Sequence, residues 1–472
     1  MSLSICFTYS LFPFAKNAMR IIYKSSFILL LVLQFIVTSC SSVNTGIESD
    51  FQKVILQAQR KVYPALVYIK VTRNDLTEGK KQSATVSGSG VIISANGEVL
   101  TNHHVITKAT DIRCLLNDGQ HFHAKLIASD KDLDLALLQL QLPENHPPLP
   151  FAKLHENTAK EGDFVMALGA PLGLTRSVTL GIISCANRII DGVDHQYNTW
   201  YQTDASLFPG NSGGPLVNTD GHVIGLNSMG ILGIGLTLPS TVILDVLPRF
   251  RQYKQVSWSW FGFQFQPLHD FECDTYFQFD NGVIISGTDR GSPARLAGIQ
   301  TNDRLISCNG LPLTAINAED IPKLNRKIAL LPFEETATFI VERNGKLLTF
   351  NIKPRSKGST EGKEKALPHW GISAKEINRF DNPTLFFYAP DGGVFVFGME
   401  DSWLRRSVNN LCKDDIIVSI DDKPVKTLAE LTEIYDNFVE HKDETPSMNF
   451  VIIRNGRKIH AVVNYIATDE AE

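Results

Sequence analysis

The apolar positions between about residues 62 and 239 fall into many short runs. "ALVYIKV", "SGVIIS", "DFVMALG" and "HVIGLNSM" are rich in β-branched and aromatic residues, and Gly, Asn or Asp separates them. Short runs of this kind bounded by turn residues are typical of antiparallel sheets, and about 180 residues of them suit two small barrels. The next run, "STVILDVLPRF", predicts a helix over residues 240–250 with Ser240 as its N-cap.

The second half of the chain contains an internal repeat with a period of about 111 residues. "NDRLISCNGLPL" begins at Asn302 and "DDIIVSIDDKPV" begins at Asp414, while "RNGK" at Arg343 recurs as "RNGR" at Arg454. An Asn-Gly pair after a β-rich run is a strong hairpin signal. We therefore expect two copies of one small module, over residues 257–355 and 369–467.

The two copies differ in one helical signal, and a polar stretch separates them. In "GSPARLAGI" of the first copy, Ser292 suits an N-cap, Pro293 the first turn and Gly298 a left-handed C-terminal position. The second copy has "DSWLRRSVN", which keeps Ser402 but has no matching glycine, so we expect a distorted or repurposed module. The charged residues 356–368 predict a flexible linker.

The N-terminal 40 residues have the pattern of an export signal. Arg20 and Lys24 precede the apolar run "FILLLVLQFIV", which is too short to span a membrane comfortably. "VTSC" then resembles a bacterial lipobox, in which Cys40 would be lipidated and become the mature N-terminus. The alternative is an uncleaved signal anchor. Ser41 is not the aspartate that retains lipoproteins at the inner membrane, so the outer membrane is favoured.

Composition excludes some functions. The 472 residues carry a net charge of −5 and a pI near 6.2, which argues against a nucleic-acid binder. Without Cys6 and Cys40 five cysteines remain, and an odd number spread this widely is not a disulfide framework. His121 and His123 alternate on one predicted strand, but the spacing of a four-ligand zinc site is absent. We expect neither a metal nor another cofactor.

The stretch "FPGNSGGPL" surrounds Ser212 with glycine. A serine hydroxyl becomes a useful nucleophile when a base takes its proton, and backbone N–H groups then stabilise the developing oxyanion. Gly210 is expected to allow a turn that aims its own N–H and that of Ser212 at one point. Gly213 and Gly214 are expected to leave room for a substrate chain.

Candidate bases and orienting carboxylates lie upstream of Ser212. "LTNHHVI" offers His103 and His104 after a predicted strand, and "DKDLDLALLQL" offers three aspartates before one. The order His, Asp, Ser is the order of chymotrypsin-like proteases. The candidate carboxylates are Asp130, Asp132 and Asp134.

Four sequence blocks carry a family resemblance. "GSGVIISANGEVLTNHHV", "DLDLALLQL", "GAPLGLTRSVTLGIIS" and "QTDASLFPGNSGGPL" resemble, in order and spacing, blocks of the HtrA/Deg family of trypsin-like serine proteases with PDZ domains. The resemblance covers nearly everything after residue 50, including both repeats. It implies a mostly β fold, with a chymotrypsin-like double antiparallel β-barrel within residues 41–250 followed by two PDZ domains of the α+β class.

The resemblance also implies a role for particular residues. The pattern Thr-Asn-any-His-Val identifies His104 as the base, the Asp-Leu-Ala block identifies Asp134 as the orienting carboxylate, and Gly-Asn-Ser-Gly-Gly identifies Ser212 as the nucleophile. Gly210, Asn211 and Ser212 match the oxyanion loop. Further matches are Arg188 in a regulatory loop, Ile231, Leu232 and Ile234 in the walls of an apolar specificity pocket, and Phe261, Gly262 and Phe263 in the carboxylate-binding loop of the first PDZ domain.

The function implied is an ATP-independent serine endopeptidase of envelope protein quality control. It would cleave unfolded proteins after small or medium apolar residues through an acyl-enzyme, while PDZ domains bind chain ends. The family resemblance implies a homotrimer at least, and the short segment "RNDLTEGKKQSAT" argues against a larger assembly. A peptide-binding chaperone that depends little on proteolysis is the alternative.

Overall fold

The computed structural model describes residues 50–76, 79–170, 177–190, 196–256, 258–358, 360–399, 410–444 and 446–466. The predicted export signal, Cys40 and Ser402 lie outside these ranges. The chain divides into two compact units, residues 1–60 and residues 61–472. Residues 50–62 are helical, and within the described ranges no helix is both long and apolar enough to cross a membrane. All that follows concerns the second unit.

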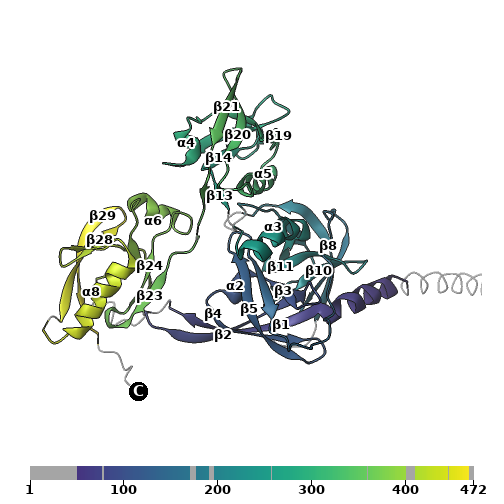
Figure 1. Cartoon of the computed structure of the whole chain (residues 1–472), viewed down its shortest axis with the longest axis horizontal. Coiled ribbons are helices and arrows are strands. Elements are labelled where there is room, and N and C mark those ends of the chain that lie inside the picture. The colour runs from purple at the N-terminus through teal and green to yellow at the C-terminus, as the bar shows by residue number, and fades with distance from the viewer. Residues whose placement is uncertain are drawn as a thin grey trace, which may run out of the picture. The chain divides into compact units, whose positions relative to one another are not determined.

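The first domain begins with a closed antiparallel barrel, in the order β1-β2-β3-β6-β5-β4 (Figure 1). Burial alternates along β4, so that Ile112, Cys114 and Leu116 point inward, as expected for a strand with one face in a core. The strands are β1 (Leu66–Asp75), β2 (Gln82–Ile92), β3 (Glu98–Thr101), β4 (Ala109–Leu116), β5 (His121–Asp130) and β6 (Leu135–Leu140).

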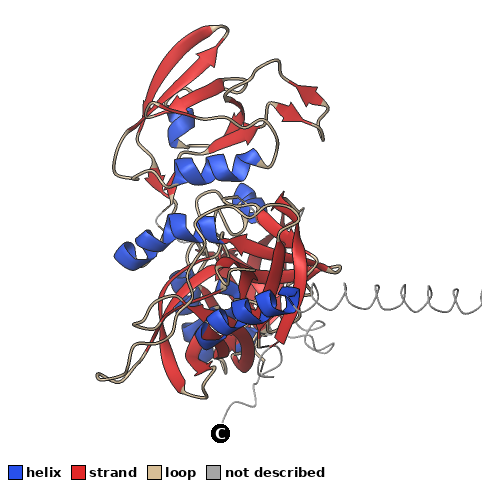
Figure 2. Ribbon diagram, turned by 90° about the vertical axis from the view of Figure 1, so that its right-hand side faces the viewer, coloured by secondary structure: helices blue, strands red, loops and turns tan. Residues whose placement is uncertain are grey.

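A second closed barrel follows, in the order β10-β11-β12-β9-β8-β7. The last strand along the chain, β12, leads directly into α3 (Ser240–Tyr253), whose buried face includes Val242, Val246 and Phe250. Figure 2 shows the strands in red and the helices in blue, and strands predominate over helices. The strands are β7 (Phe164–Gly169), β8 (Ser177–Arg188), β9 (Trp200–Thr203), β10 (Pro215–Asn218), β11 (Val223–Ile231) and β12 (Ile234–Pro239). The predicted double barrel is confirmed.

The predicted N-cap of α3 is wrong. Pro239 is the N-cap and has no side-chain cap bond, whereas Ser240 is the first helical residue. The Ser240 hydroxyl donates instead to the carbonyl oxygen of His155 at 2.7 Å and so joins the helix to a distant loop.

The first C-terminal module is a mixed α+β unit around one apolar core. The sheet order is β14-β17-β18-β20-β21, which leaves β14 at an edge among the described residues. Ser292 caps α4 by accepting from the amide of Arg295, as predicted, and Gly298 has a positive φ. The elements are β13 (Ser259–Trp260), β14 (Phe263–Gln266), β15 (His269–Asp270), β16 (Thr275–Tyr276), β17 (Val283–Thr288), α4 (Pro293–Leu296), β18 (Arg304–Cys308), β19 (Leu311–Pro312), α5 (Asp320–Ala329), β20 (Ala337–Arg343), β21 (Lys346–Ile352) and β22 (Arg355–Ser356).

The sheet of the second module has the same strand order, with β23 added at one edge. It runs β23-β24-β25-β26-β28-β29. Its core contains Trp370, Phe438 and Phe450, each almost wholly buried. The elements are β23 (Glu364–Leu367), the 3₁₀ turn η3 (Pro368–Trp370), β24 (Ile372–Glu376), α6 (Pro383–Tyr388), β25 (Val394–Met399), β26 (Ile416–Ile420), β27 (Lys423–Pro424), α8 (Leu428–Glu440), β28 (Ser447–Arg454) and β29 (Arg457–Asn464).

The prediction of a flexible linker over residues 356–368 is wrong. Strand β23 lies within this stretch, and β22 ends at its first residue. The side chain of Lys357 is only 2% exposed and forms an ion pair at 2.5 Å with Asp132 of the first barrel. Charged residues that would solvate a free linker are used here in ion pairs.

Candidate active site

A short helical turn holds His104 beside the first barrel. The turn α2 (His103–Ile106) follows β3, and its buried residues Val105 and Ile106 anchor it against the core. The side chain of Asn102, which precedes the turn, donates to the carbonyl oxygen of Asp134 at 3.0 Å. The imidazole of His104 remains 47% exposed, which leaves it accessible to a substrate.

Asp134 holds His104 from the turn before β6. Its carboxylate lies 2.9 Å from Nδ1 of His104 and also accepts the backbone N–H of His104 at 3.0 Å. Its φ is +51°, a left-handed conformation that aspartate tolerates better than most residues. A carboxylate at Nδ1 fixes the ring orientation and leaves Nε2 as the nitrogen that faces a reaction partner.

Ser212 lies on the loop between β9 and β10, at the junction of the two barrels. Its carbonyl oxygen accepts the N–H of Ser89 in β2 at 2.8 Å, which fixes the loop against the first barrel. Its hydroxyl donates to the carbonyl oxygen of Ser228 at 2.8 Å and not to the imidazole of His104. Ser212, His104 and Asp134 nevertheless line one cavity.

Sequence analysis did not identify Ser228, which contacts two of these residues. Its hydroxyl donates to the Asp134 carboxylate at 2.5 Å, and its carbonyl oxygen accepts from Ser212. Ser228 lies in β11, where a serine within an apolar strand carries no local signal of its own. A buried polar residue in such a strand is the kind of feature that a search for hydrogen-bond partners would find.

The loop before Ser212 presents two backbone amides. Gly210 has a φ of +102°, and its carbonyl oxygen accepts the Ser89 hydroxyl at 2.6 Å. Among the described residues, no acceptor is bonded to the N–H of Gly210 or of Ser212. The side chain of Asn211 is buried and accepts from the hydroxyl of Ser177 at 3.2 Å. The backbone N–H of Asn211 donates to the carbonyl oxygen of Phe208 at 2.9 Å, so Asn211 does not present a third amide.

The predicted reason for the next two glycines is wrong. A Cβ atom at Gly213 would lie 2.2 Å from the carbonyl oxygen of Ser89, and one at Gly214 would lie 2.2 Å from that of Leu168. These glycines allow the loop to approach the protein's own strands. They do not leave space for a substrate chain.

The cavity at this junction has a volume of about 700 Å³. Leu207, Phe208, Met229 and Gly230 give it an apolar side beside Ser212. The cavity is also lined by the charged residues Lys131, Asp132 and Glu361.

The structure does not bring the three predicted specificity residues to this cavity. Ile231 pairs with Ile234 across a tight hairpin, and Leu232 at the tip is 98% exposed. The residues that line the cavity come from earlier in β11 and from the loop before Ser212. Arg188 ends β8 and donates to the side chain of Gln202 at 2.7 Å. His123 pairs with the carboxylate of Asp111 at 2.9 Å.

A buried charged cluster adjoins the turn that carries Asp134. Burial, and next the charge of Asp132, raise the pKa of Asp130 to about 7. The Asp130 carboxylate accepts the indole N–H of Trp258 at 2.6 Å and the N–H of Leu133 at 2.9 Å. Asp132 accepts from Lys357 at 2.5 Å. The turn therefore contacts Trp258, just before the first module, and Lys357, just after it.

The predicted carboxylate loop of the first module precedes the edge strand β14. Phe261 is buried in the core, and Gly262 has a φ of +77°. A Cβ at Gly262 would lie 2.2 Å from Cβ of Ser292, so only glycine fits. The carbonyl oxygens of Phe261 and Gly262 accept backbone amides of Ala294 and Asp289. Phe263 begins β14 and packs against the core.

Comparison with protein families assigns two parts of the chain. The family described as "Trypsin-like peptidase domain" matches residues 88–226. The family described as "PDZ domain" matches residues 259–353.

Characterised relatives and solved structures give the same assignment. Periplasmic serine endoprotease DegP of Salmonella typhimurium is 32% identical over 369 residues, which cover 76% of this chain and 74% of the relative. The DegP of Escherichia coli is 31% identical with the same coverage. The structure titled "HtrA-type protease AlgW with tripeptide" aligns with a TM-score of 0.54 and 30% identity, covering 64% of this chain and 96% of that one.

Proposed function

Because the chain belongs to the HtrA/Deg family of trypsin-like serine proteases, we propose that it degrades unfolded or misfolded proteins of the cell envelope without ATP. The observation that carries the proposal is the His104–Asp134 pair at 2.9 Å in the cavity that Ser212 also lines. We assign His104 as the general base, Asp134 as its orienting partner and Ser212 as the nucleophile.

The first chemical step transfers the Ser212 proton to His104. The hydroxyl must first leave the carbonyl oxygen of Ser228, and a rotation about the Cα–Cβ bond of Ser212 is the smallest motion that releases it. The Ser212 oxygen then attacks the peptide carbonyl carbon as Nε2 of His104 accepts the proton. Asp134, itself held by Ser228, stabilises the imidazolium that forms.

The tetrahedral intermediate places its oxyanion near the amides of Gly210 and Ser212. Loss of one such donor typically costs about 2.7–4 kcal/mol of transition-state stabilisation. His104 next protonates the leaving amine, the C–N bond breaks, and an acyl-enzyme remains on Ser212. Water, deprotonated by His104, hydrolyses the ester and restores the serine.

We assign the apolar side of the cavity to the substrate residue before the cut. Leu207, Met229 and Gly230 favour small or medium apolar side chains there. The test is a map of the fragments produced from an unfolded protein. Cuts after Val, Ala or Ile are expected, and a majority of cuts after Lys or Arg would exclude this assignment.

The first module is proposed to bind chain ends. Strand β14 offers an open sheet edge, and the Gly262 loop beside it suits the capture of a terminal carboxylate by backbone amides. A fluorescent peptide with an apolar C-terminal residue is expected to bind the full chain. The same peptide with an amidated C-terminus is the control and should bind much more weakly.

Location and assembly complete the proposal. The relatives named above are periplasmic, and the N-terminal pattern supports export with a lipid on Cys40. Mass spectrometry of the mature protein should find an acylated Cys40, and an unmodified N-terminus elsewhere would exclude the anchor. We expect a homotrimer, which size-exclusion chromatography coupled to light scattering would detect.

One experiment decides between a protease and a chaperone. Wild type and Ser212→Ala are incubated with casein, and the remaining intact casein is measured. We expect turnover by wild type alone, together with covalent labelling of Ser212 by a fluorophosphonate. Equal clearance by both proteins, with no labelling, would leave only the chaperone.

A further inference from the structure

The second module differs from the first at its peptide-binding edge. In the first module, the strand before the binding loop, β13, pairs with β22 and leaves the edge of β14 open. In the second module, the corresponding strand, β23, pairs with β24 itself. The edge that would accept a peptide is therefore already occupied by four residues of the same chain.

Strand β23 lies as a bound peptide would lie. It runs antiparallel to β24, with Glu364 opposite Lys375 and Leu367 opposite Ile372, toward the loop at Trp370. A peptide added to a sheet edge gains backbone hydrogen bonds from the strand and a pocket for its side chains. The bond from the N–H of Glu376 to the carbonyl oxygen of Lys363 extends the same ladder by one pair.

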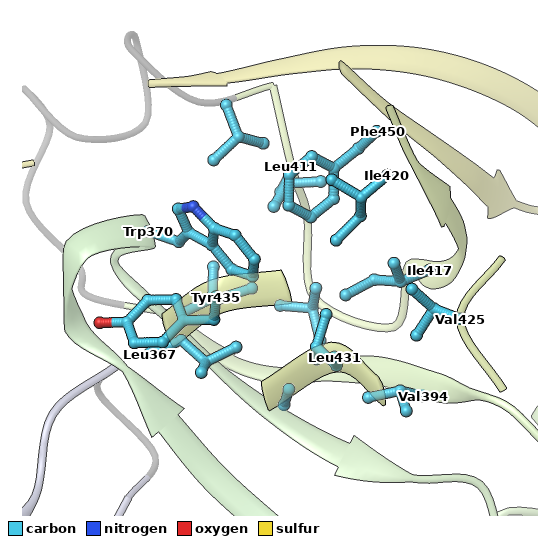
Figure 3. Close-up of a cluster of buried hydrophobic side chains, with 14 of the residues drawn as sticks. Leu367, Trp370, Val394, Leu411, Ile417, Ile420, Val425, Leu431, Tyr435 and Phe450 are labelled. Carbon is cyan, nitrogen blue, oxygen red and sulfur yellow. The ribbon is translucent and has the colours of Figure 1, made fainter. Parts of the chain in front are cut away.

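Helix α8 forms the other wall of this groove, and Leu367 packs into the core between the two walls. The Leu367 side chain is fully buried in one cluster with Trp370, Leu431 and Tyr435 (Figure 3). The ammonium group of Lys365 lies 3.6 Å from Asp436 and 5.9 Å from the centre of the Tyr435 ring, both on α8. The second module thus holds β23 through backbone pairing with β24, the buried side chain of Leu367 and the charge of Lys365.

We propose that β23 is a built-in strand ligand of the second module. The partner of this groove is the chain's own segment 364–367, so that chain ends bind at the first module alone. This inference deepens the proposed function, because it concerns the regulation of the same protease.

Strand β23 and the residues that lead into it also form ion pairs and contacts with residues at or next to the active-site cavity. Lys357 pairs with Asp132, Glu361 lies 3.6 Å from Nε2 of His103, and Glu364 pairs with Lys108 at 2.5 Å. His103 directly precedes His104, and Asp132 lies two residues before Asp134. The contact with His103, together with the charges of Lys131 and Lys375, holds the pKa of Glu361 below its ordinary value, although burial opposes this. Glu361 is therefore charged at neutral pH where it lines the cavity.

Release of β23 would consequently change the groove of the second module and the active-site cavity together. The segment that leaves the groove carries Glu361 with it, so access to the apolar side of the cavity would widen. An extended stretch of unfolded substrate is the competitor, since the β24 edge binds backbone. The tether gives β23 an effective concentration in the millimolar range, so a free peptide at micromolar concentration would not displace it.

A disulfide that fastens β23 tests the proposal. Residues 364 and 375 are opposite each other, and the bonded pair 363/376 beside them makes them a non-hydrogen-bonded pair, in which Cα atoms lie about 4.5 Å apart. The double variant Glu364→Cys/Lys375→Cys should therefore form the bond on mild oxidation, as read by mass spectrometry. The oxidised protein should cleave casein at least fivefold more slowly than the same sample after reduction.

The single variants Glu364→Cys and Lys375→Cys, treated identically, control for the lost charges and for the native thiols. Failure of the disulfide to form in folded protein would show that β23 is not docked. A disulfide that forms and leaves turnover unchanged would equally overturn the proposal. Bond formation is measured without reference to activity, so failure of the proposed function would be seen separately.

A second experiment releases β23 from the groove, in protein that also carries Ser212→Ala. In the ladder set by the 363/376 bond, the N–H of Lys365 points to β24 and that of Ala366 points away. Lys365→Pro should therefore release the strand, whereas Ala366→Pro should leave it paired. A fluorescent peptide of residues 360–368, "TEGKEKALP", should bind Lys365→Pro at least tenfold more tightly than either wild type or Ala366→Pro. Equal binding to all three would overturn the proposal.

Discussion

The two C-terminal modules share the order of their sheet strands and differ in the pairing of the short strand that precedes the sheet. In the first, β13 and β22 pair with each other and leave the outer edge of β14 unpaired among the described residues. In the second, the chain beyond β29 bonds to the binding loop, where the N–H of Ile466 donates to the carbonyl oxygen of His369 at 2.9 Å. The strand before the loop then pairs with β24. Whether the outer edge of β14 or β24 is open is therefore decided by where the flanking segments pair, and not by the module's fold.

The largest effect is expected at Lys357, where the segment that leaves the first module is anchored. Its ammonium group is buried against Asp132 and the side chain of Gln196. Lys357→Ala leaves a buried carboxylate without its partner, which typically costs about 3–5 kcal/mol of unfolding free energy. Urea unfolding of the full chain measures the loss. Lys363→Ala, at an exposed position of the same segment, is the control, and equal effects would show that the segment is an ordinary linker.

Leu367 should come next, because it anchors β23 in the second module. Leu367→Ala removes a fully buried side chain from the core cluster and is expected to cost about 2–5 kcal/mol. Lys365→Ala on the same strand removes a partly exposed side chain and should change stability by about 0.5 kcal/mol or less. Unfolding followed by urea titration compares the two. A small loss at Leu367 would mean that β23 contributes little to its module.

Much of the architecture followed from local signals. Asn344-Gly345 and Asn455-Gly456 both adopt the positive φ values that tight hairpin turns require, as the repeat predicted. The order of the His, Asp and Ser blocks, together with their family resemblance, predicted that their side chains share one site, and His104, Asp134 and Ser212 do line one cavity. These features depend on residues close in sequence, or on blocks whose order is itself a signal.

The features that sequence analysis missed depend on pairing over long distances. Lys357 and Asp132 are 225 positions apart, and a lysine in a charged stretch predicts solvent unless its partner is known. Ser228 contacts Asp134 across 94 positions. The family resemblance assigned Leu232 to the pocket wall, but the register of β11 and β12 places it at an exposed turn. Sequence analysis could not supply these contacts because each belongs to tertiary structure.

A smaller effect is expected in how stability depends on pH, through two aspartates, Asp130 and Asp381. Asp130, bonded to Trp258 just before the first module, has a pKa raised to about 7 by burial and then by Asp132. For Asp381 in the second module, burial opposes ionisation, but Lys131 and Lys375 outweigh it and lower the pKa. Between about pH 4 and pH 7, Asp130 keeps a proton that the unfolded chain releases, so its contribution to stability falls as pH rises.

Asp381 contributes stability that is present above its ordinary pKa and lost only in more acidic solution. Asp130→Asn should therefore remove a slope of at most about 1.4 kcal/mol per pH unit between pH 5 and pH 7, while keeping an acceptor for Trp258. Asp381→Asn should lower stability without changing that slope. Urea unfolding at several pH values measures both, and parallel curves for Asp130→Asn and wild type would contradict the assignment.

The smallest expected effect concerns the N-terminal caps of two helices, α5 in the first module and α8 in the second. Helix α8 begins with a capping box in which Thr427 and Glu430 bond each other's backbone amides, whereas α5 has no side-chain cap at Glu319. Thr427→Ala should cost about 1 kcal/mol, and Glu319→Ala should change stability by about 0.5 kcal/mol or less. Because α8 also covers β23, the loosened cap should speed amide exchange of residues 364–367. Faster exchange there with Glu319→Ala as well would mean that β23 is not held by α8, and that the occupied groove depends on the β24 ladder alone.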